Sequence, residues 1–149
     1  MIRKIWSFLF GIYKEHTFWV VKFLGIKIKF HCINQLEEVC DIHTSKQLKE
    51  KGTYFPHPIG IVIHKDAEIG QNCTILQNVT IGLGKYNEER NTNIPTIGNN
   101  VLICANAVLI GGIKVGDNAV IGAGSVVLHD VPDNAVVAGN PAKIIKYKE

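Results

Sequence analysis

Between Ile63 and Pro132 an aliphatic residue returns at every sixth position, with one interruption between Ile81 and Ile97. This period matches neither the 3.6-residue turn of an amphipathic helix nor the two-residue alternation of an ordinary strand. It matches a solenoid in which each hexad forms one short strand and one corner, and three hexads close a triangular coil. The repeat aliphatics are Ile63, Ile69, Ile75, Ile81, Ile97, Ile103, Leu109, Val115, Ile121 and Val127.

A second small or apolar residue stands four positions after each repeat aliphatic except Ile81, as at Cys73, Val101 and Ala119. Glycine follows several of the repeat aliphatics directly, and asparagine precedes several of the second apolar positions. Both residue types tolerate the positive φ angles that a tight corner needs. The residues expected at such corners are Gly70, Gly82, Gly98, Gly116, Gly122, Asn72, Asn100 and Asn118.

The hexads, for example Ile69-Gly70-Gln71-Asn72-Cys73-Thr74, resemble those of the hexapeptide-repeat acyltransferases over roughly residues 50–146. The resemblance implies an all-β fold, a left-handed parallel β-helix, which is an exception to the right-handed crossover rule. It also implies a homotrimer, because three thin coils packed side by side would bury their flat outer faces. We expect a capping or membrane-proximal segment over residues 1–52 and the β-helix acyltransferase domain over 53–149, with a projecting loop, 83–95, and a tail, 133–149.

Residues 1–31 are aromatic, aliphatic and basic, and no run reaches the 18 or so uncharged residues that a membrane span requires. Two interpretations stay open. The segment forms one or two short helices that cap the open end of the solenoid, or it rests as a basic interfacial segment on an anionic membrane surface. The four cysteines contain no CxxC pair and favour a reduced, cytoplasmic compartment, with peripheral contact at the inner face of the membrane as the second interpretation. The net charge of +3 is spread along the chain and gives no case for nucleic acid.

His57 is the candidate general base, because histidine titrates close to neutral pH and can accept a proton from a hydroxyl. It lies between Pro56 and Pro58 and six residues before Ile63. Strict register would aim it into the coil as a buried structural histidine, whereas the two prolines interrupt the strand ladder and favour catalysis. We adopt the catalytic interpretation and keep His64, at the next corner, as the reserve candidate.

The segment around His57 resembles the catalytic histidine segment of serine acetyltransferases, in which a His-x-x-Gly-Ile-Val pattern starts the repeat. The chain departs from the serine acetyltransferase pattern at two positions that bear on which acceptor it uses. Pro56 stands where those enzymes have an aspartate, and Ile94 stands where their loop has a second histidine before a proline. The segment is more similar to the short acetyltransferases of capsule, exopolysaccharide and lipopolysaccharide gene sets. We therefore expect an acetyl-CoA-dependent O-acetyltransferase acting on a sugar hydroxyl of a surface polysaccharide or its precursor, with serine O-acetyltransferase of cysteine biosynthesis as the alternative.

The resemblance implies acetyl-CoA as the donor, lying in a groove beside the coils. Ala105 and Ala123 match family positions that contact this cofactor, and Lys143 in the tail is placed to approach its phosphates. The polar loop of residues 83–95 interrupts the repeat, and binding groups often lie on such excursions from a rigid scaffold. Its candidates are Gly84 and Lys85 for the thioester end of the cofactor and Tyr86, Asn87 and Arg90 for the substrate.

The expected mechanism is direct transfer, in which His57 takes the proton of the acceptor hydroxyl and a backbone N–H near the loop stabilises the oxyanion. No serine or cysteine has a recognisable base beside it, so we expect no covalent acyl-enzyme. His57 of one subunit and loop 83–95 of another would meet in the cleft between them. A zinc hydratase needs a His-x4-His pair and a third histidine; His57 and His64 are spaced differently, so no metal is expected. A non-catalytic β-helix is the remaining alternative.

Overall fold

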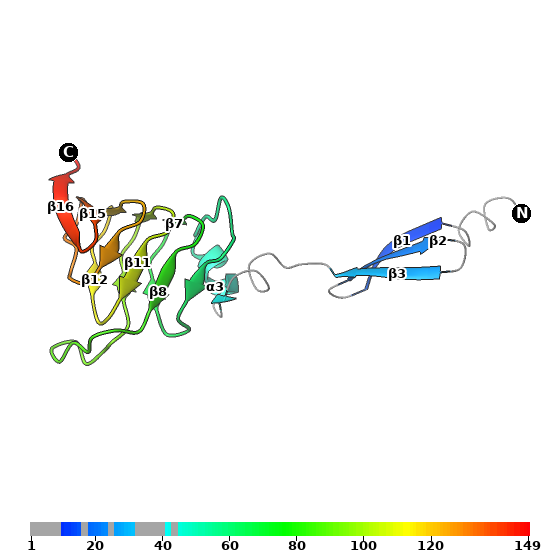
Figure 1. The fold of residues 1–149 in the computed structure, drawn as a ribbon, viewed down its shortest axis with the longest axis horizontal. Helices are drawn as coiled ribbons and strands as arrows, with labels where there is room; N and C mark the ends of the chain where they lie inside the picture. The colour runs from blue at the N-terminus through cyan, green and yellow to red at the C-terminus, as the bar shows by residue number, and fades with distance from the viewer. Residues whose placement is uncertain (1–9, 16–17, 24–25, 32–40, 43–44) are drawn as a thin grey trace, which may run out of the picture. The chain divides into compact units, whose positions relative to one another are not determined.

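A computed structural model describes residues 10–15, 18–23, 26–31, 41–42 and 45–149. The chain divides into two compact units, Met1–Asn34 and Gln35–Glu149 (Figure 1). Within the described residues, none of the helices has the length and apolar content needed to cross a membrane.

The N-terminal unit contains an antiparallel sheet of three strands, β1 (Phe10–Glu15), β2 (Phe18–Phe23) and β3 (Ile26–His31), in that order. The expectation of a helical segment is wrong for these residues. Aromatic and β-branched residues dominate the strands, and β3 alternates between apolar and basic residues, which is strand periodicity. Only two residues separate consecutive strands, the length of a tight hairpin connection. The expectation for residues 1–9 concerns a part of the chain outside the described residues.

The second unit is a parallel β-helix, as the six-residue period predicts (Figure 1). The chain passes in turn over three faces, which we name A, B and C. Face A contains β4 (Asp41–Ile42), β5 (Val62–Ile63), β8 (Thr80–Gly82), β11 (Val108–Ile110) and β14 (Val126–Val127). Face B contains β6 (Glu68–Ile69), β9 (Thr96–Ile97) and β12 (Lys114–Val115). Face C contains β7 (Thr74–Ile75), β10 (Leu102–Ile103), β13 (Val120–Ile121), β15 (Ala135–Gly139) and β16 (Ala142–Tyr147).

We name each corner by the two faces that it joins in chain order, AB, BC and CA. We count the coils from Tyr54, which opens the first one. Strands on the same face pair in parallel, except that β15 and β16 pair antiparallel. Asn140 and Pro141 connect these two strands, and the peptide bond between them is cis.

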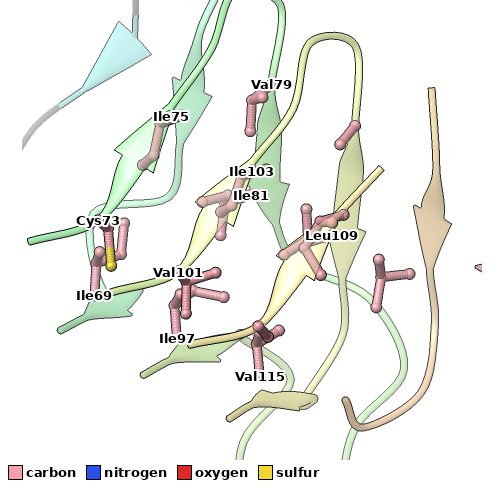
Figure 2. Packing of buried hydrophobic residues seen from close by; sticks show 14 of the residues in the cluster. Ile69, Cys73, Ile75, Val79, Ile81, Ile97, Val101, Ile103, Leu109 and Val115 are labelled. Atoms are coloured by element: carbon pink, nitrogen blue, oxygen red, sulfur yellow. The ribbon is translucent and has the colours of Figure 1, made fainter. Parts of the chain in front are cut away.

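The core is a set of stacked aliphatic columns, because the second residue of each two-residue strand points inward. Ile69, Ile97 and Val115 form one such column on face B (Figure 2). All ten repeat aliphatics are buried, and each contributes about 1.5–3 kcal/mol through burial. Ser125 and Thr53 are the buried polar residues among those described.

Of the two residue types expected at the corners, only one adopts the positive φ angle at the predicted positions. Asparagine takes it at the predicted corners, with φ near 55° at Asn72, Asn100 and Asn118. Gly98 and Gly116 do not adopt a positive φ angle. Because they have no side chain, they leave room for a side chain of the next coil. A Cβ on Gly98 would lie 2.3 Å from Asp117 Oδ1, and one on Gly116 would lie 2.2 Å from Asp133 Oδ1. These glycines are therefore required by close packing.

The open end of the first coil carries a short helix, α3 (Ser45–Glu50) (Figure 1). The helix ends at Gly52, which has a φ of 78°. Thr53 N–H donates to Leu48 O over 2.9 Å and Gly52 N–H donates to Lys49 O over 3.0 Å, which is the Schellman pattern. Leu48 is only 3% exposed and belongs to the core. The helix thus covers apolar surface that the first coil would expose.

Candidate active site

His57 lies exposed at corner CA of the first coil, because this corner is longer than the others. Tyr54 pairs with Thr74, and Val62 pairs with Thr80, so eight positions on the first coil match six on the second. Phe55 therefore follows the register of the buried Ile75 and packs against the core. The two extra residues displace His57 outward. The interpretation of a buried structural histidine is wrong, because it assumed a corner of ordinary length.

The corner holds His57 in a defined turn. Ile59 N–H donates to His57 O over 2.8 Å, which closes a γ-turn centred on Pro58. Asn78 N–H donates to Ile59 O over 2.9 Å and fastens the turn to the second coil. Gly60 completes the corner with a φ of 63°. Among the described residues no side chain hydrogen-bonds to the imidazole of His57, so the ring is open to a ligand.

The small candidate residues for the cofactor lie along the same corner. Ala105 and Ala123 occupy corner CA on the third and fourth coils, half-buried and exposed respectively. A Cβ on the neighbouring Gly124 would meet no atom within 4 Å, so the surface there is open. Lys143 pairs with Ala138 at the end of this edge. His57, Ala105, Ala123 and Lys143 thus follow one edge of the coil in order, although the sequence separates them widely.

Loop 83–95 leaves the coil at another corner, AB, directly after β8. Gly84 N–H donates to Asn93 O over 3.0 Å, and Asn87 and Thr92 form an antiparallel bridge. The loop leans toward the later coils. A Cβ on Gly84 would lie 2.6 Å from the nitrogen of Gly111. The loop therefore packs backbone to backbone on the third coil.

Arg90 anchors the loop to the fourth coil. Its guanidinium donates to the two carboxylate oxygens of Asp130 over 2.9 and 2.8 Å and to Gly112 O over 2.6 Å. Partial burial raises the pKa of Asp130, but hydrogen bonds from Arg90 and from Lys114 N–H, with both positive charges, lower it below the ordinary value overall. A two-pronged pair of this kind fixes geometry as well as charge.

An open pocket of about 750 Å³ lies between the loop and corner AB of the third and fourth coils. Tyr86 hydroxyl donates to Asn91 Oδ1, and Asn87 Oδ1 accepts from Arg90 N–H. The predicted substrate residues Tyr86, Asn87 and Arg90 therefore line one pocket together with Lys85. His57 does not line it. In a single chain the candidate residues form two groups, one at corner CA and one at corner AB.

His64 lies at corner AB of the first coil with its side chain 25% exposed. Asp66 N–H donates to His64 Nδ1 over 3.3 Å, and the Asp66 carboxylate lies 3.9 Å from the same nitrogen. The sequence placed His64 at a corner but contained no signal for this hydrogen bond.

Neither thiol that the structure describes is arranged as a nucleophile. Cys73 is fully buried, and burial raises its pKa. Burial also raises the pKa of Cys104. Because the thiolate is the reactive form, both shifts disfavour nucleophilic attack. Across the described part of the chain, no three histidine, cysteine or acidic side chains gather as they would around a metal ion.

Residues 94–129 match the family described as bacterial transferase hexapeptide (six repeats). Serine acetyltransferase of Bacillus licheniformis is 34% identical over 146 residues, which are 97% of this chain and 63% of that protein. The chain belongs to the hexapeptide-repeat transferases. Its fold is the left-handed parallel β-helix that the resemblance implied.

Two solved structures are similar to this hexapeptide-repeat transferase in both sequence and fold. Serine acetyltransferase of Neisseria gonorrhoeae, solved in complex with serine, is 42% identical with a TM-score of 0.57; the match covers 64% of this chain and 38% of that one. A serine acetyltransferase solved in complex with CoA is 40% identical with a TM-score of 0.56, and the match covers 62% and 37%. The chain spans less than two thirds of the length of each of these relatives.

These comparisons contradict the expected sugar acceptor. The expectation rested on Pro56 and Ile94, two single positions in which the chain departs from serine acetyltransferases. The similar proteins, at 34–42% identity, are nevertheless named serine acetyltransferases. A local resemblance around His57 carries less information than identity over most of the coil. The alternative that the sequence left open is therefore the better supported one.

Proposed function

We propose that this hexapeptide-repeat transferase moves an acetyl group from acetyl-CoA to the hydroxyl of serine. The names of its relatives support the reaction. The observation that carries the proposal for this chain is the exposed imidazole of His57, free of side-chain partners among the described residues and in line with Ala105 and Ala123 along corner CA. An unpartnered histidine on a rigid corner suits a general base.

In the proposed step the Nε2 or Nδ1 lone pair of His57 takes the proton of the serine hydroxyl. The hydroxyl oxygen attacks the thioester carbonyl carbon, and the new C–O bond forms as the carbonyl becomes an oxyanion. The C–S bond then breaks, and the departing thiolate takes the proton back from His57. The products are the acetyl ester of serine and CoA, and the enzyme is unchanged.

The donor fits corner CA because the side chains there are small. Ala105, Ala123 and Gly124 leave the backbone of the third and fourth coils accessible to an extended arm. Lys143 lies toward the far end of this edge, where an ammonium group suits the phosphates of CoA. We propose that Gly84 and Lys85 approach the thioester end, with Tyr86 and Asn87 at the acceptor. Arg90 is tied to Asp130 and holds the loop in position.

The two groups of candidate residues meet if three chains assemble with face A toward a common axis. On the four coils counted from Tyr54, the outward residues of the face A strands carry no charge, namely Val62, Thr80, Val108 and Val126, whereas face B presents Glu68 and Lys114. Around a threefold axis, corner CA of one chain lies beside corner AB of the next. A homotrimer would thus supply His57 from one subunit and loop 83–95 from its neighbour.

The test measures release of the CoA thiol from acetyl-CoA with L-serine as acceptor. We expect serine-dependent release, and about a 10²–10⁴-fold lower kcat/KM for His57→Ala. The unfolding temperature of the variant should be unchanged because the ring is exposed. A wild-type protein that releases no CoA with serine, or an unaffected His57→Ala variant, would refute the proposal. L-threonine and glucose serve as contrasting acceptors.

We also propose that the N-terminal unit contacts an anionic membrane surface from the cytoplasmic side. Residues 1–34 contain six lysines and arginines and one glutamate, a net charge of +5, while residues 35–149 contain ten basic and twelve acidic residues, a net charge of −2. Basic segments rich in aromatic residues favour anionic interfaces. The protein should sediment with phosphatidylglycerol vesicles at low salt and not with phosphatidylcholine vesicles. Failure to sediment with either refutes this proposal.

A further inference from the structure

We infer that His64 of one subunit faces His57 of the next and donates a hydrogen bond to the carboxylate of the acceptor. This inference rests on the proposed function, specifically on the threefold packing of face A, and it names a residue that recognises the acceptor.

His57 and His64 flank the same strand of the first coil. His57 lies at corner CA just before β5, and His64 follows β5 at corner AB. The backbone N–H of His64 donates to Ile81 O over 2.8 Å. This hydrogen bond holds the corner against the second coil, close to where loop 83–95 begins. The two imidazoles thus stand at opposite edges of face A in one chain.

Threefold symmetry brings these edges together at one level. Rotation about an axis parallel to the coil moves a residue around the axis but leaves its height unchanged. Successive strands on a face are about 4.8 Å apart, and the chain climbs only part of this distance between His57 and His64. His64 of one subunit therefore comes opposite His57 of its neighbour when corner CA meets corner AB.

Loop 83–95 is directed away from this level. Its contacts are with Gly111 and Gly112 on the third coil and with Asp130 on the fourth. The loop position expected to hold a second histidine is Ile94, which cannot hydrogen-bond through its side chain. Among the described residues of corner AB, His64 is the histidine that lies at the height of His57 along the coil axis.

The hydrogen bond to His64 determines what the ring can offer. Because Asp66 N–H donates to Nδ1, the neutral ring carries its proton on Nε2 and presents an N–H donor on the other side. Lys65 Nζ lies 3.9 Å from the Asp66 carboxylate, so the charges of these two neighbours offset each other. The Nε2–H donor of His64 then suits the carboxylate of an amino acid.

Kinetics distinguish this role from a structural one. We expect His64→Ala to raise KM for L-serine at least tenfold while KM for acetyl-CoA stays within twofold, because one charge-assisted hydrogen bond to the acceptor is lost. His64→Gln keeps an N–H donor near the position of Nε2 and should recover most of the affinity. Glu68→Gln, on the exposed side of face B, is the matched control. An unchanged KM for serine in His64→Ala overturns the inference.

Mixed trimers test whether the two histidines come from different chains. Alone, His57→Ala and His64→Ala chains each lack one group at every site. After unfolding and refolding together in equal amounts, about one quarter of the sites pair an intact His57 with an intact His64 from the neighbour. With L-serine well below its KM, activity should rise above that of both parents. If both histidines acted within one chain, mixing would restore nothing.

A crosslinking experiment tests the positions of the two histidines without relying on serine acetylation. Failure of this inference can therefore be told apart from failure of the proposed function. A His57→Cys, His64→Cys chain treated with a short bis-maleimide should give covalent dimers and trimers. The two single variants control for the native cysteines. Crosslinking by the double variant supports the juxtaposition even if serine is not acetylated. Absence of intermolecular products beyond those of the single variants overturns it whatever the activity.

Discussion

The backbone of Tyr54 pairs with that of Thr74 on the next coil, and this one bridge decides where the imidazole of His57 lies. Val62 comes eight positions after Tyr54, whereas its partner Thr80 comes six positions after Thr74. The surplus is absorbed by the turn around Pro58, and His57 is carried outward. A candidate general base is thus presented by a local lengthening of an otherwise regular repeat.

Gly60→Ala should destabilise the protein and lower acyl transfer. The residue has a φ of 63°, and an added Cβ would lie 2.3 Å from Asn78 Oδ1. Strain of this kind is on the order of 1–3 kcal/mol, and its relief would shift the turn that holds His57. Gly82→Ala is the control, because a Cβ there meets no atom within 4 Å. Thermal unfolding and CoA release should both distinguish the two variants; equal unfolding temperatures would contradict the prediction.

Asp130→Asn should loosen loop 83–95 in a manner that depends on pH. The pKa of Asp130 in the folded protein lies below its ordinary value of 3.8, so the charged carboxylate stabilises the fold at pH values above 3.8. This contribution disappears as the pH falls through the lowered pKa. Limited proteolysis of the loop should therefore be faster in Asp130→Asn than in wild type at neutral pH. The two proteins should converge in strong acid. A difference independent of pH would contradict the role of the charge.

Asp117→Ala should destabilise the coil by about 1 kcal/mol, because a backbone donor loses its partner. Asn99 N–H donates to Asp117 Oδ1 over 2.7 Å, and Asp117 N–H donates to Asp133 Oδ1 over 2.8 Å, so side chains at corner BC cap successive coils. Asp117→Asn keeps the oxygen and should be nearly neutral. Denaturant unfolding measures both. If Asp117→Asn destabilises the coil as much as Asp117→Ala, the lost charge and not the lost hydrogen bond from Asn99 N–H explains the effect.

Ser125→Ala should raise the free energy of unfolding by about 1 kcal/mol, since it removes a buried hydroxyl that pays a desolvation penalty without a hydrogen bond. Ser125 is fully buried, and among the described residues its Oγ has no hydrogen-bond partner. Ala107 occupies the equivalent place on the preceding coil, so the methyl group fits. Ala107→Ser is the reciprocal control and should destabilise. A lower unfolding temperature for Ser125→Ala would show that the hydroxyl is satisfied.

The sequence singled out His57 by its two flanking prolines, whereas Ala105 and Ala123 were named from the family resemblance. The structure places all three at corner CA, and their roles stay predictions. The anchoring of Arg90 could not be predicted, since its partner Asp130 lies 40 residues away. The N-terminal strands were missed because aromatic and basic residues fit a short helix as well as a hairpin. Their antiparallel pairing decides between the two.

The coil could be predicted from the sequence, because a six-residue period repeats the same inward aliphatic residue and the same corner. The period also determined which columns are buried. Three features came only from the folded chain: Tyr54 pairs with Thr74, His57 therefore lies outside, and loop 83–95 contacts the later coils through Arg90 and Asp130. These are pairings between distant segments, and no local periodicity encodes the alignment of one coil on the next.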